Sequence, residues 1–182
     1  MKKMQIFMTL FIAIIMISSV IGFLYIPNDQ QQPGVLEFNK IKFYPQQNNK
    51  YLATYNNQQL LFDYLPSQLS TITLPVLYPI NTGKLYIIYN ATEADSSTFY
   101  LIEKLSYNLN LLGKPASQAC VSEQDCPDIP IKDCNSPSIY LKKSNTSRMY
   151  NEESCIIIEG DSLYQSQASD KLIQGFLGIT GG

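Results

Sequence analysis

The feature that most constrains this chain is a long, nearly all apolar run near its N-terminus. The run from Ile6 to Ile26 is 21 residues long, and no charged residue occurs between Lys3 and Asp29. As an α-helix rising about 1.5 Å per residue, such a run matches the roughly 30 Å hydrocarbon core of a bilayer. We therefore predict that residues 1–26 form a transmembrane signal anchor.

The basic residues predict the orientation of this helix. Lys2 and Lys3 precede it, and no Lys or Arg follows until Lys40. The N-terminus is therefore expected in the cytoplasm and the C-terminal part outside the cell membrane, which the chain crosses once. A cleaved signal peptide is the alternative, with a poor cleavage site at Val20-Ile21-Gly22, although its apolar region is usually about 7–15 residues. Because the first cysteine is Cys120, a lipoprotein signal is excluded.

Downstream of the anchor, the composition predicts a linker and one domain. Residues 27–34 (PNDQQQPG) are polar and flanked by prolines, as in a short tether. Residues 35–182 are enough for one extracytoplasmic domain with its own core and too few for two. Two of the 13 basic residues lie in the anchor, so 11 face 15 acidic residues and the net charge is −4. Without a basic cluster, we expect no nucleic-acid partner.

The cysteines predict disulfides. All four follow the anchor, at Cys120, Cys126, Cys134 and Cys155. An even number in an oxidising compartment indicates two bridges, each worth about 2–4 kcal/mol. A zinc site or a thioredoxin-type redox centre is less favoured, because no C-x-x-C spacing occurs. Sequence leaves three pairings open, and short loop closure favours Cys120–Cys126 with Cys134–Cys155.

Polar residues of the exported part suggest two further kinds of site. Asn90 and Asn145 begin N-x-S/T triplets in polar turns and are candidate glycosylation sites. Four carboxylates near the cysteines are candidate calcium ligands, namely Glu123, Asp125, Asp128 and Asp133. Their spacing does not match the D-x-[DN]-x-[DN]-G loop, and a solvated acidic loop is the alternative. We expect no bound metal and no cofactor.

The first half of the ectodomain is expected to form strands. Apolar residues alternate over residues 36–43, but the alternation changes parity between Phe38 and Ile41, which indicates a bulge or a break. Farther on, Asn56-Asn57 separates two short runs of Tyr, Leu and Phe. Because asparagine tolerates positive φ, this pattern predicts a hairpin.

The second half contains two similar strand–loop–helix units. Apolar runs at 85–89 and 155–158 indicate buried strands. Each is followed by a helical pattern, capped by Ser96, Ser97 or Thr98 in the first unit and by Asp161-Ser162 in the second. Such units predict neighbouring parallel strands with helices packed on the sheet. Additional strands are expected at 119–121, 138–142 and 148–150. The predicted fold class is α/β or α+β, with a mixed β-sheet and two main helices besides the transmembrane helix.

Four segments behind the anchor carry a resemblance: LYIIYN, CPDIPIKDC, SCIIIEGD and DKLIQGFLGI. They resemble a group of uncharacterised single-pass membrane proteins from archaea with small genomes, over most of the ectodomain. The resemblance implies an extracytoplasmic compartment and an α/β build, and it implies no activity.

The residue types argue against most hydrolytic mechanisms. The chain has no His, which removes Ser-His-Asp and Cys-His catalysis and the commonest general base. It also lacks the P-loop, dinucleotide-binding, G-x-S-x-G and H-E-x-x-H motifs. Carboxylate pairs such as Glu152-Glu153 or Glu93 with Asp95 could serve acid–base chemistry only if folding brought them together. No catalytic residue is assigned.

A binding role fits the composition better. The 13 tyrosines suit recognition surfaces, since each offers an apolar ring and a hydroxyl. We expect a non-enzymatic module that is tethered to the membrane and binds a protein partner or contributes to a cell-envelope assembly. The alternative is an envelope hydrolase that uses Ser or carboxylates in place of His. A concave pocket with shifted pKa values would favour the hydrolase, and a flat tyrosine-rich patch the binding module.

Overall fold

A computed structural model of the chain describes residues 34–77 and 84–179. The chain divides into two units, residues 1–34 and 35–182, and the second contains the elements below. The predicted anchor and all but the last residue of the linker lie outside the described residues. Within the described part of the chain, no helix combines the length and the apolar character needed to cross a membrane.

A four-stranded antiparallel sheet opens the domain. Its strands pair in chain order, as β1 (Leu36–Phe38), β2 (Ile41–Pro45), β3 (Tyr51–Tyr55) and β4 (Gln58–Phe62). The predicted hairpin at Asn56-Asn57 is confirmed, with φ of 48° and 61° at the two asparagines. The parity change after Phe38 is a break and not a bulge: Asn39 and Lys40, also at positive φ, form a two-residue turn between antiparallel strands. Two short 3-10 turns flank β3 and β4, at η1 (Gln47–Asn49) and η2 (Pro66–Leu69).

A five-stranded mixed sheet forms from the second half of the chain. Its order is β6-β5-β7-β9-β8, with β8 the only antiparallel strand among these five. The bounds are β5 (Leu85–Tyr89), β6 (Ala116–Cys120), β7 (Ser138–Lys143), β8 (Arg148–Glu152) and β9 (Cys155–Gly160). The strand predicted to start at Ala119 is therefore β6, which ends at Cys120. The short turn η4 (Ala91–Glu93) follows β5.

The two strand–helix units are parallel, as predicted, but they are not neighbours. Strand β7 lies between β5 and β9 and pairs with both. After the first helix the chain returns to β6 on one side of β5, and the next segment brings β7 to the other side. The repeat in the sequence indicates parallel strands correctly, but it contains no information on the strand inserted between them.

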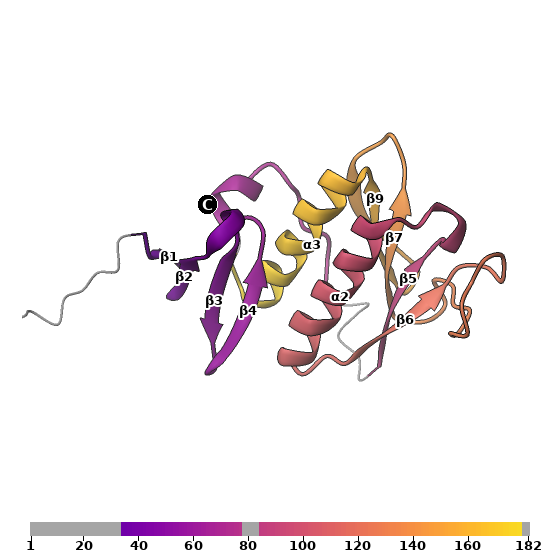
Figure 1. Cartoon of the computed structure of the whole chain (residues 1–182), viewed down its shortest axis with the longest axis horizontal. Helices are drawn as coiled ribbons and strands as arrows, with labels where there is room; N and C mark the ends of the chain where they lie inside the picture. Colours follow the sequence, from indigo (N-terminus) through magenta and orange to yellow (C-terminus); the bar gives the residue numbers. More distant parts are fainter. Residues whose placement is uncertain (1–33, 78–83, 180–182) are drawn as a thin grey trace, which may run out of the picture. The chain divides into compact units, whose positions relative to one another are not determined.

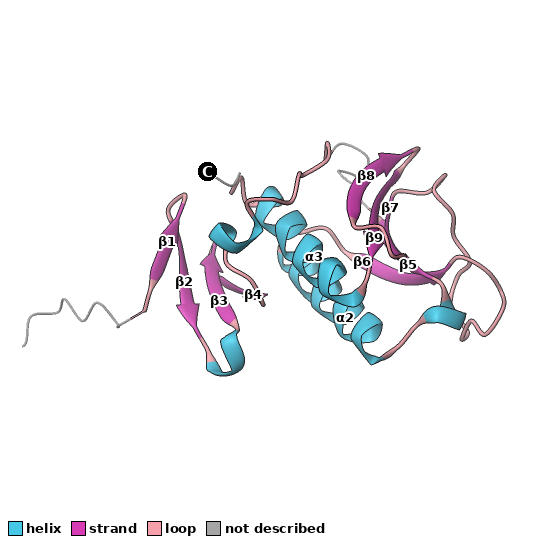
Figure 2. Cartoon of the chain, turned by 90° about the horizontal axis from the view of Figure 1, so that it is seen from above, coloured by secondary structure: helices cyan, strands magenta, loops and turns pink. Residues whose placement is uncertain are grey.

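Two helices lie side by side between the two sheets (Figures 1 and 2). They are α2 (Ser96–Leu111) and α3 (Ser162–Phe176). The four-stranded sheet, the two helices and the five-stranded sheet form three layers that share one core. Its buried side chains come from all three layers and include Phe43, Leu60, Phe62, Leu105, Leu172, Ile139 and Ile158. Over the described residues the fold is therefore a mixed α and β fold with two helices, as predicted, but it has two sheets where one was expected.

Aspartates cap both helices. The Asp161 carboxylate accepts a hydrogen bond from Tyr164 N at 2.8 Å, which confirms the predicted start of α3. In α2 the cap is Asp95 and not one of the three following residues. Its Oδ1 accepts from Thr98 N at 2.9 Å, while Thr98 Oγ1 accepts from Asp95 N. This reciprocal pair satisfies two helix-end donors, and the carboxylate also suits the helix dipole.

Candidate functional site

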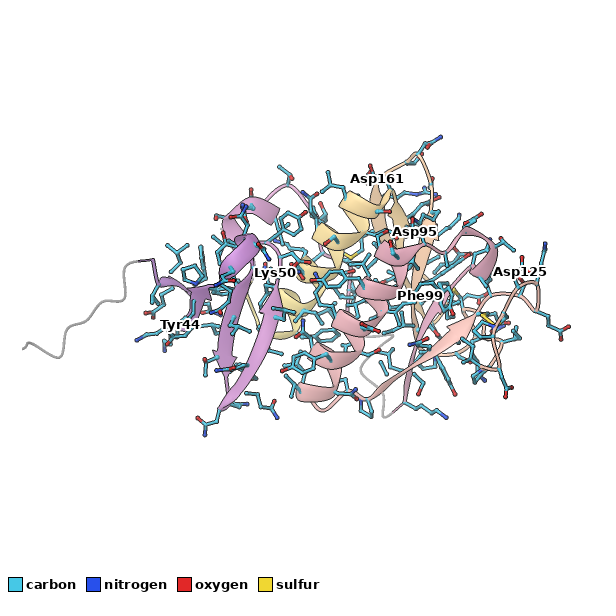
Figure 3. The ribbon with its side chains drawn as sticks, viewed as in Figure 1. Tyr44, Lys50, Asp95, Phe99, Asp125 and Asp161 are labelled. Atoms are coloured by element: carbon cyan, nitrogen blue, oxygen red, sulfur yellow. A yellow bond between two sulfur atoms is a disulfide. The ribbon has the colours of Figure 1, made fainter. Side chains whose placement is uncertain are left out.

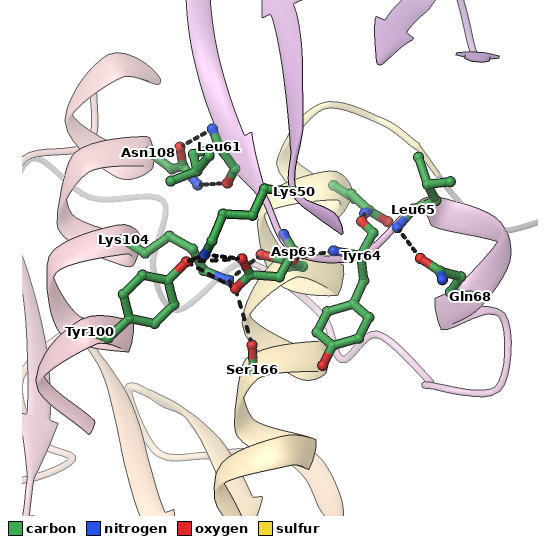
Figure 4. Close-up of polar contacts among 12 residues, drawn as sticks. Lys50, Leu61, Asp63, Tyr64, Leu65, Gln68, Tyr100, Lys104, Asn108 and Ser166 are labelled. Carbon is green, nitrogen blue, oxygen red and sulfur yellow. Dashed lines mark hydrogen bonds and ion pairs between the residues drawn. The ribbon is translucent and has the colours of Figure 1, made fainter. Parts of the chain in front are cut away.

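A chain of ion pairs links β4 to both helices (Figure 4). Lys104 Nζ, from α2, lies 2.6 Å from Asp63 Oδ2 and 2.8 Å from Asp170 Oδ1 of α3. The Lys104 side chain is 2 % exposed and that of Asp170 is 0 % exposed. Charges buried to this extent require close partners of opposite sign. Lys104 therefore cannot lose either carboxylate without leaving a charge uncompensated.

Helix side chains also bind the backbone of β4 and of the two residues after it. Among the described strands, β4 pairs only with β3. Asp170 Oδ2 accepts hydrogen bonds from the backbone N–H groups of Asp63 and Tyr64, at 2.7 and 2.9 Å. Asn108 donates to Leu61 O at 2.8 Å and accepts from Leu61 N at 3.0 Å. Buried backbone groups need such partners. The helices thus supply the hydrogen bonds that another strand would supply at a sheet edge.

The ion-pair chain reaches the surface at Lys50. Its Nζ lies 2.7 Å from Asp63 Oδ1 and donates a hydrogen bond to the Tyr100 hydroxyl, which itself donates to Asp63 Oδ1 at 2.9 Å. Lys50 is 35 % exposed and Asp63 16 %. The same residues therefore end a buried network and border solvent.

A polar pocket of about 560 Å³ opens beside this end of the network. Its lining comes from the turn before β3 and from the segment after β4: Asn48, Asn49, Lys50 and Tyr51, with Asp63, Tyr64 and Gln68. This volume lies within the range of roughly 300–1,000 Å³ found for small-molecule sites.

The pKa values of the network show which groups hold protons. Burial opposes ionisation of Asp63, but Lys104 and Lys50 outweigh it and hold the pKa of Asp63 at about 2. Burial acts against the Lys104 ammonium too, yet Asp170 and Asp63 raise the pKa of Lys104 above its ordinary 10.5. Burial raises the pKa of Asp170 to about 6 in spite of Lys104. Lys104 therefore stays protonated near neutral pH.

This protonation state bears on the alternative hydrolase. Ser166 Oγ lies 3.4 Å from Asp63 Oδ2, so a serine does adjoin the network. A serine nucleophile needs a neighbouring base, but Asp63 has its pKa at about 2 and Lys104 is protonated. This arrangement does not activate Ser166.

A second candidate site is the face of the five-stranded sheet turned away from the helices. Along the strands, residues such as Ile87 and Ile158 join the helix-side core, while Ile88 and Ile157 belong to a separate cluster on the other face. Strand register aligns five residues of this outer face in one row across the sheet, in the order Ala119, Ile88, Tyr140, Ile157 and Tyr150. Tyr86 adds a third aromatic ring to this cluster. Ala119, Ile88 and Ile157 are buried, whereas the three tyrosines are half-buried and reach the surface. We call these residues the tyrosine face.

Charged residues form the adjacent row of the tyrosine face. Lys142, Glu159 and Arg148 are aligned across β7, β9 and β8. Glu159 pairs with Lys142 at 3.2 Å and with Arg148 at 2.6 Å, and it accepts a hydrogen bond from the Tyr150 hydroxyl. Hydrogen bonding from Arg148 lowers the pKa of Glu159 to about 2. The row carries two cations and one carboxylate, so one positive charge remains beside the tyrosines.

A third candidate site is a depression of about 390 Å³ where β7 and β9 meet the start of α3. Lys143 Nζ contacts Asp95 Oδ2 at 2.7 Å and Ser162 Oγ at 2.8 Å. Ligands of parallel sheets often bind at these strand ends. Here the lysine is paired with the aspartate that caps α2, and Asp161 lies in the lining as well, so the depression does not favour an anion.

The cysteines form the two disulfides that the sequence predicts, in the pairing favoured by loop length. Cys120 joins Cys126, and Cys134 joins Cys155. The second bridge fastens the loop before β7 to the first residue of β9 and lies beside the tyrosine face. The disulfides therefore hold the loop region of the five-stranded sheet.

The remaining residues singled out in the sequence lie at the surface. Glu123, Asp125, Asp128 and Asp133 are all exposed (Figure 3 labels Asp125), and within the described ranges no group of three or more His, Cys, Asp or Glu could hold a metal ion. Glu152 and Glu153 are exposed, and Asp95 is occupied as a helix cap.

The two predicted glycosylation sites lie in different settings. The Asn90 side chain caps the turn η4, where its Oδ1 accepts hydrogen bonds from Thr92 N and Oγ1. Asn145 is exposed in the loop after β7. Glycosylation of either residue remains a prediction.

Sequence reasoning missed the ion-pair network. Its signal is nevertheless present, because polar residues occupy positions of the helices that should be apolar. Lys104 and Asn108 are four residues apart on the buried side of α2, and Asp170 and Gln174 are four apart on that of α3. Polar residues at buried helix positions indicate paired groups. The chain matches no family model, no curated protein and no solved structure.

Proposed function

We propose that this chain is a membrane-tethered extracytoplasmic module that binds a protein partner in the cell envelope through the tyrosine face. One observation carries the proposal: Tyr140 and Tyr150 lie in one cross-strand row with two isoleucines, on a sheet face opposite the helices. The isoleucines are buried, and the half-buried tyrosines over them are bordered by a charged row. Aromatic side chains with a polar rim are typical of protein interfaces.

The residues of the tyrosine face fit recognition in a second way. Burial raises the pKa of both Tyr140 and Tyr150, so both hydroxyls are protonated at neutral pH, and that of Tyr150 donates to Glu159. The rigid ring of tyrosine gives contact area at a small entropic cost. The disulfide at Cys155 and the flanking parallel strands limit the motion of this face.

The tether is part of the proposal. The apolar run of residues 6–26 supports an anchor with a cytoplasmic N-terminus, and two disulfides suit an oxidising compartment. The resemblance to single-pass archaeal membrane proteins implies the same topology. The chain should stay in the membrane fraction after carbonate washing, with its C-terminus open to external protease. A soluble protein with a mature N-terminus near Phe23 would contradict the anchor.

The test compares a double variant of the tyrosine face with a double variant of the four-stranded sheet. Tagged full-length chain is captured from membranes dissolved in a mild detergent, and co-purifying proteins are quantified by mass spectrometry. The test variant is Tyr140→Ser with Tyr150→Ser. The control is Tyr44→Ser with Leu52→Ser, two paired residues on β2 and β3 that do not belong to the helix-side core.

Loss of a specific envelope protein with the test variant but not with the control supports the proposal. Equal recovery of that protein with all variants contradicts it. Turnover in peptidase, esterase or glycosidase screens, abolished by changing one serine or one carboxylate while folding is intact, would replace the binding module with the hydrolase.

A further inference from the structure

We propose that the polar pocket beside Lys50 binds a small, uncharged, hydroxyl-rich ligand, a saccharide of one or two units. This inference concerns the four-stranded sheet and does not depend on the tyrosine face. It follows from the charge, the hydrogen-bonding groups and the aromatic side chains of the pocket lining.

The charges of the pocket cancel within the protein. Lys50 pairs with Asp63, Asp63 with Lys104, and Lys104 with Asp170, at 2.7, 2.6 and 2.8 Å. Two cations and two carboxylates leave no net charge. A charged ligand would have to break the Lys50–Asp63 pair or to enter without a counter-charge, and both cost free energy. The pocket therefore favours a neutral ligand.

Amide groups remain available to such a ligand. Among the described residues, the side chains of Asn48 and Asn49 have no hydrogen-bond partner, and both border the pocket. Gln68 accepts from Leu65 N through its Oε1, so its NH₂ group is not used by that bond. Each carboxamide offers donors and an acceptor side by side. Vicinal hydroxyls, which both donate and accept, match this set of groups.

The backbone fixes the two asparagines at the pocket. Asn48 and Asn49 have φ of 60° and 56°, in the left-handed region that asparagine tolerates better than other residues with a side chain. A hydrogen bond of 2.7 Å from Gln46 N to Lys50 O closes the turn around them. Because the turn is closed, both amides are presented by one short, constrained segment.

Aromatic side chains complete the lining. Tyr51, the first residue of β3, and Tyr64, which follows β4, are half-buried and border the pocket. A sugar ring has apolar C–H faces as well as hydroxyl edges, so it can pack on an aromatic ring while its hydroxyls bond to amides. An ionic metabolite without a sugar ring offers neither apolar C–H faces to the tyrosines nor vicinal hydroxyls to the amides. A purely apolar ligand would leave the amides unpaired.

The experiment measures saccharide binding to the full chain. The protein is placed in lipid nanodiscs, because glycoside detergents would compete. Saturation-transfer NMR is recorded with cellobiose, maltose and diacetylchitobiose, and with glucuronic acid and glucosamine as charged probes. The test variant is Asn48→Gly with Asn49→Gly, which removes both amides and keeps the left-handed backbone accessible. The matched control is Asn56→Gly with Asn57→Gly, the same change in the β3–β4 turn.

We expect at least one neutral disaccharide to bind saturably, with a dissociation constant of roughly millimolar or tighter. Binding should weaken at least tenfold in the Asn48/Asn49 variant and stay unchanged in the control. Three results would overturn the proposal: binding of no neutral probe, equal binding by the test variant, or binding of the charged probes alone. Circular dichroism checks that both variants are folded, and none of these results depends on the protein partner.

Discussion

Strands β5, β7 and β9 contact the helices with isoleucine and leucine side chains, whereas β4 and the segment directly after it also contact them with backbone groups and a carboxylate. On the first side the contact is the apolar core that includes Ile87, Ile139 and Ile158. On the other side, Asp63 and the backbone of Leu61 bind Lys104, Asp170 and Asn108. Both disulfides lie in the five-stranded half.

The difference shows how one pair of helices can hold two sheets of different kinds. Apolar packing is not directional, so it stabilises a parallel sheet whose register is already set by its own strands. Hydrogen bonds and buried ion pairs require defined distances. The polar contacts therefore fix the position of β4 along the helices, and with it the position of the pocket. The predictions below test this division of roles.

The largest effect is expected from breaking the ion-pair network. Lys104→Met removes the cation shared by Asp63 and Asp170 and leaves a buried carboxylate without compensation. We expect a loss of about 3–5 kcal/mol in the free energy of unfolding, measured by urea denaturation.

Two further variants test whether this loss comes from the buried charge. Lys104→Met combined with Asp170→Asn should recover part of the loss, because Asn keeps an acceptor for the β4 backbone and removes the charge. Lys142→Met breaks the more exposed pair with Glu159 and should cost less than about 1 kcal/mol. Equal losses for Lys104→Met and Lys142→Met would show that burial of the network has no energetic consequence.

The disulfides should stabilise by amounts that follow their loop lengths. Their sequence separations are 21 residues for Cys134–Cys155 and 6 for Cys120–Cys126. Replacing both cysteines by serine should cost about 3 kcal/mol for the first bridge and about 2 kcal/mol for the second. Hydrogen exchange should increase in β7 and β9 and remain unchanged in β1–β4. Increased exchange in both sheets would contradict the view that the disulfides stabilise only the five-stranded sheet.

Asn108→Leu tests the hydrogen bonds to β4 separately from the charges. The variant leaves the N–H and C=O of Leu61 without partners, at a cost of about 2 kcal/mol. Asn110→Leu, at an exposed position of the same helix, is the control and should change stability by less than about 0.5 kcal/mol. If the two variants are equally stable in urea, Asn108 does not replace a neighbouring strand.

The last effect is the dependence of stability on pH. Folding raises the pKa of Asp170 from 3.8 to about 6, so between these values the folded state binds more protons and stability falls as pH rises. One pKa unit corresponds to about 1.4 kcal/mol, and the raised pKa already includes the pairing with Lys104, so the shift sets an upper limit of about 3 kcal/mol on this fall. The lowered pKa of Asp63 acts oppositely: its contribution is present above pH 3.8 and is lost as pH falls through about 2.

Urea denaturation between pH 4 and 7 measures this slope. Asp170→Asn should abolish the fall, whereas Asp125→Asn in the exposed disulfide loop should retain it. A wild-type protein whose stability rises from pH 4 to 6, in parallel with Asp170→Asn, would show that Asp170 is ionised throughout.

Local signals allowed several elements to be predicted. The Asn56-Asn57 turn, the apolar runs of β5 and β9 and the cap at Asp161 each depend on a few consecutive residues, and the structure has all of them. The start of α2 was misplaced because serine, threonine and aspartate are all good caps, and only the position of the Asp95 carboxylate against Thr98 N distinguishes them. The candidate sites were not predictable in this way, because their residues come from separate segments.

The sequence by itself determined the periodicity of the strands and helices, the even set of cysteines, the absence of histidine and the abundance of tyrosine. These properties depend on residue type and near neighbours. Only the tertiary structure decided that there are two sheets, that β7 separates β5 from β9, that Tyr140 and Tyr150 share one row, and that Lys104 lies between Asp63 and Asp170. Each of these depends on contacts between residues distant in the chain, whose geometry is set by packing around the helices.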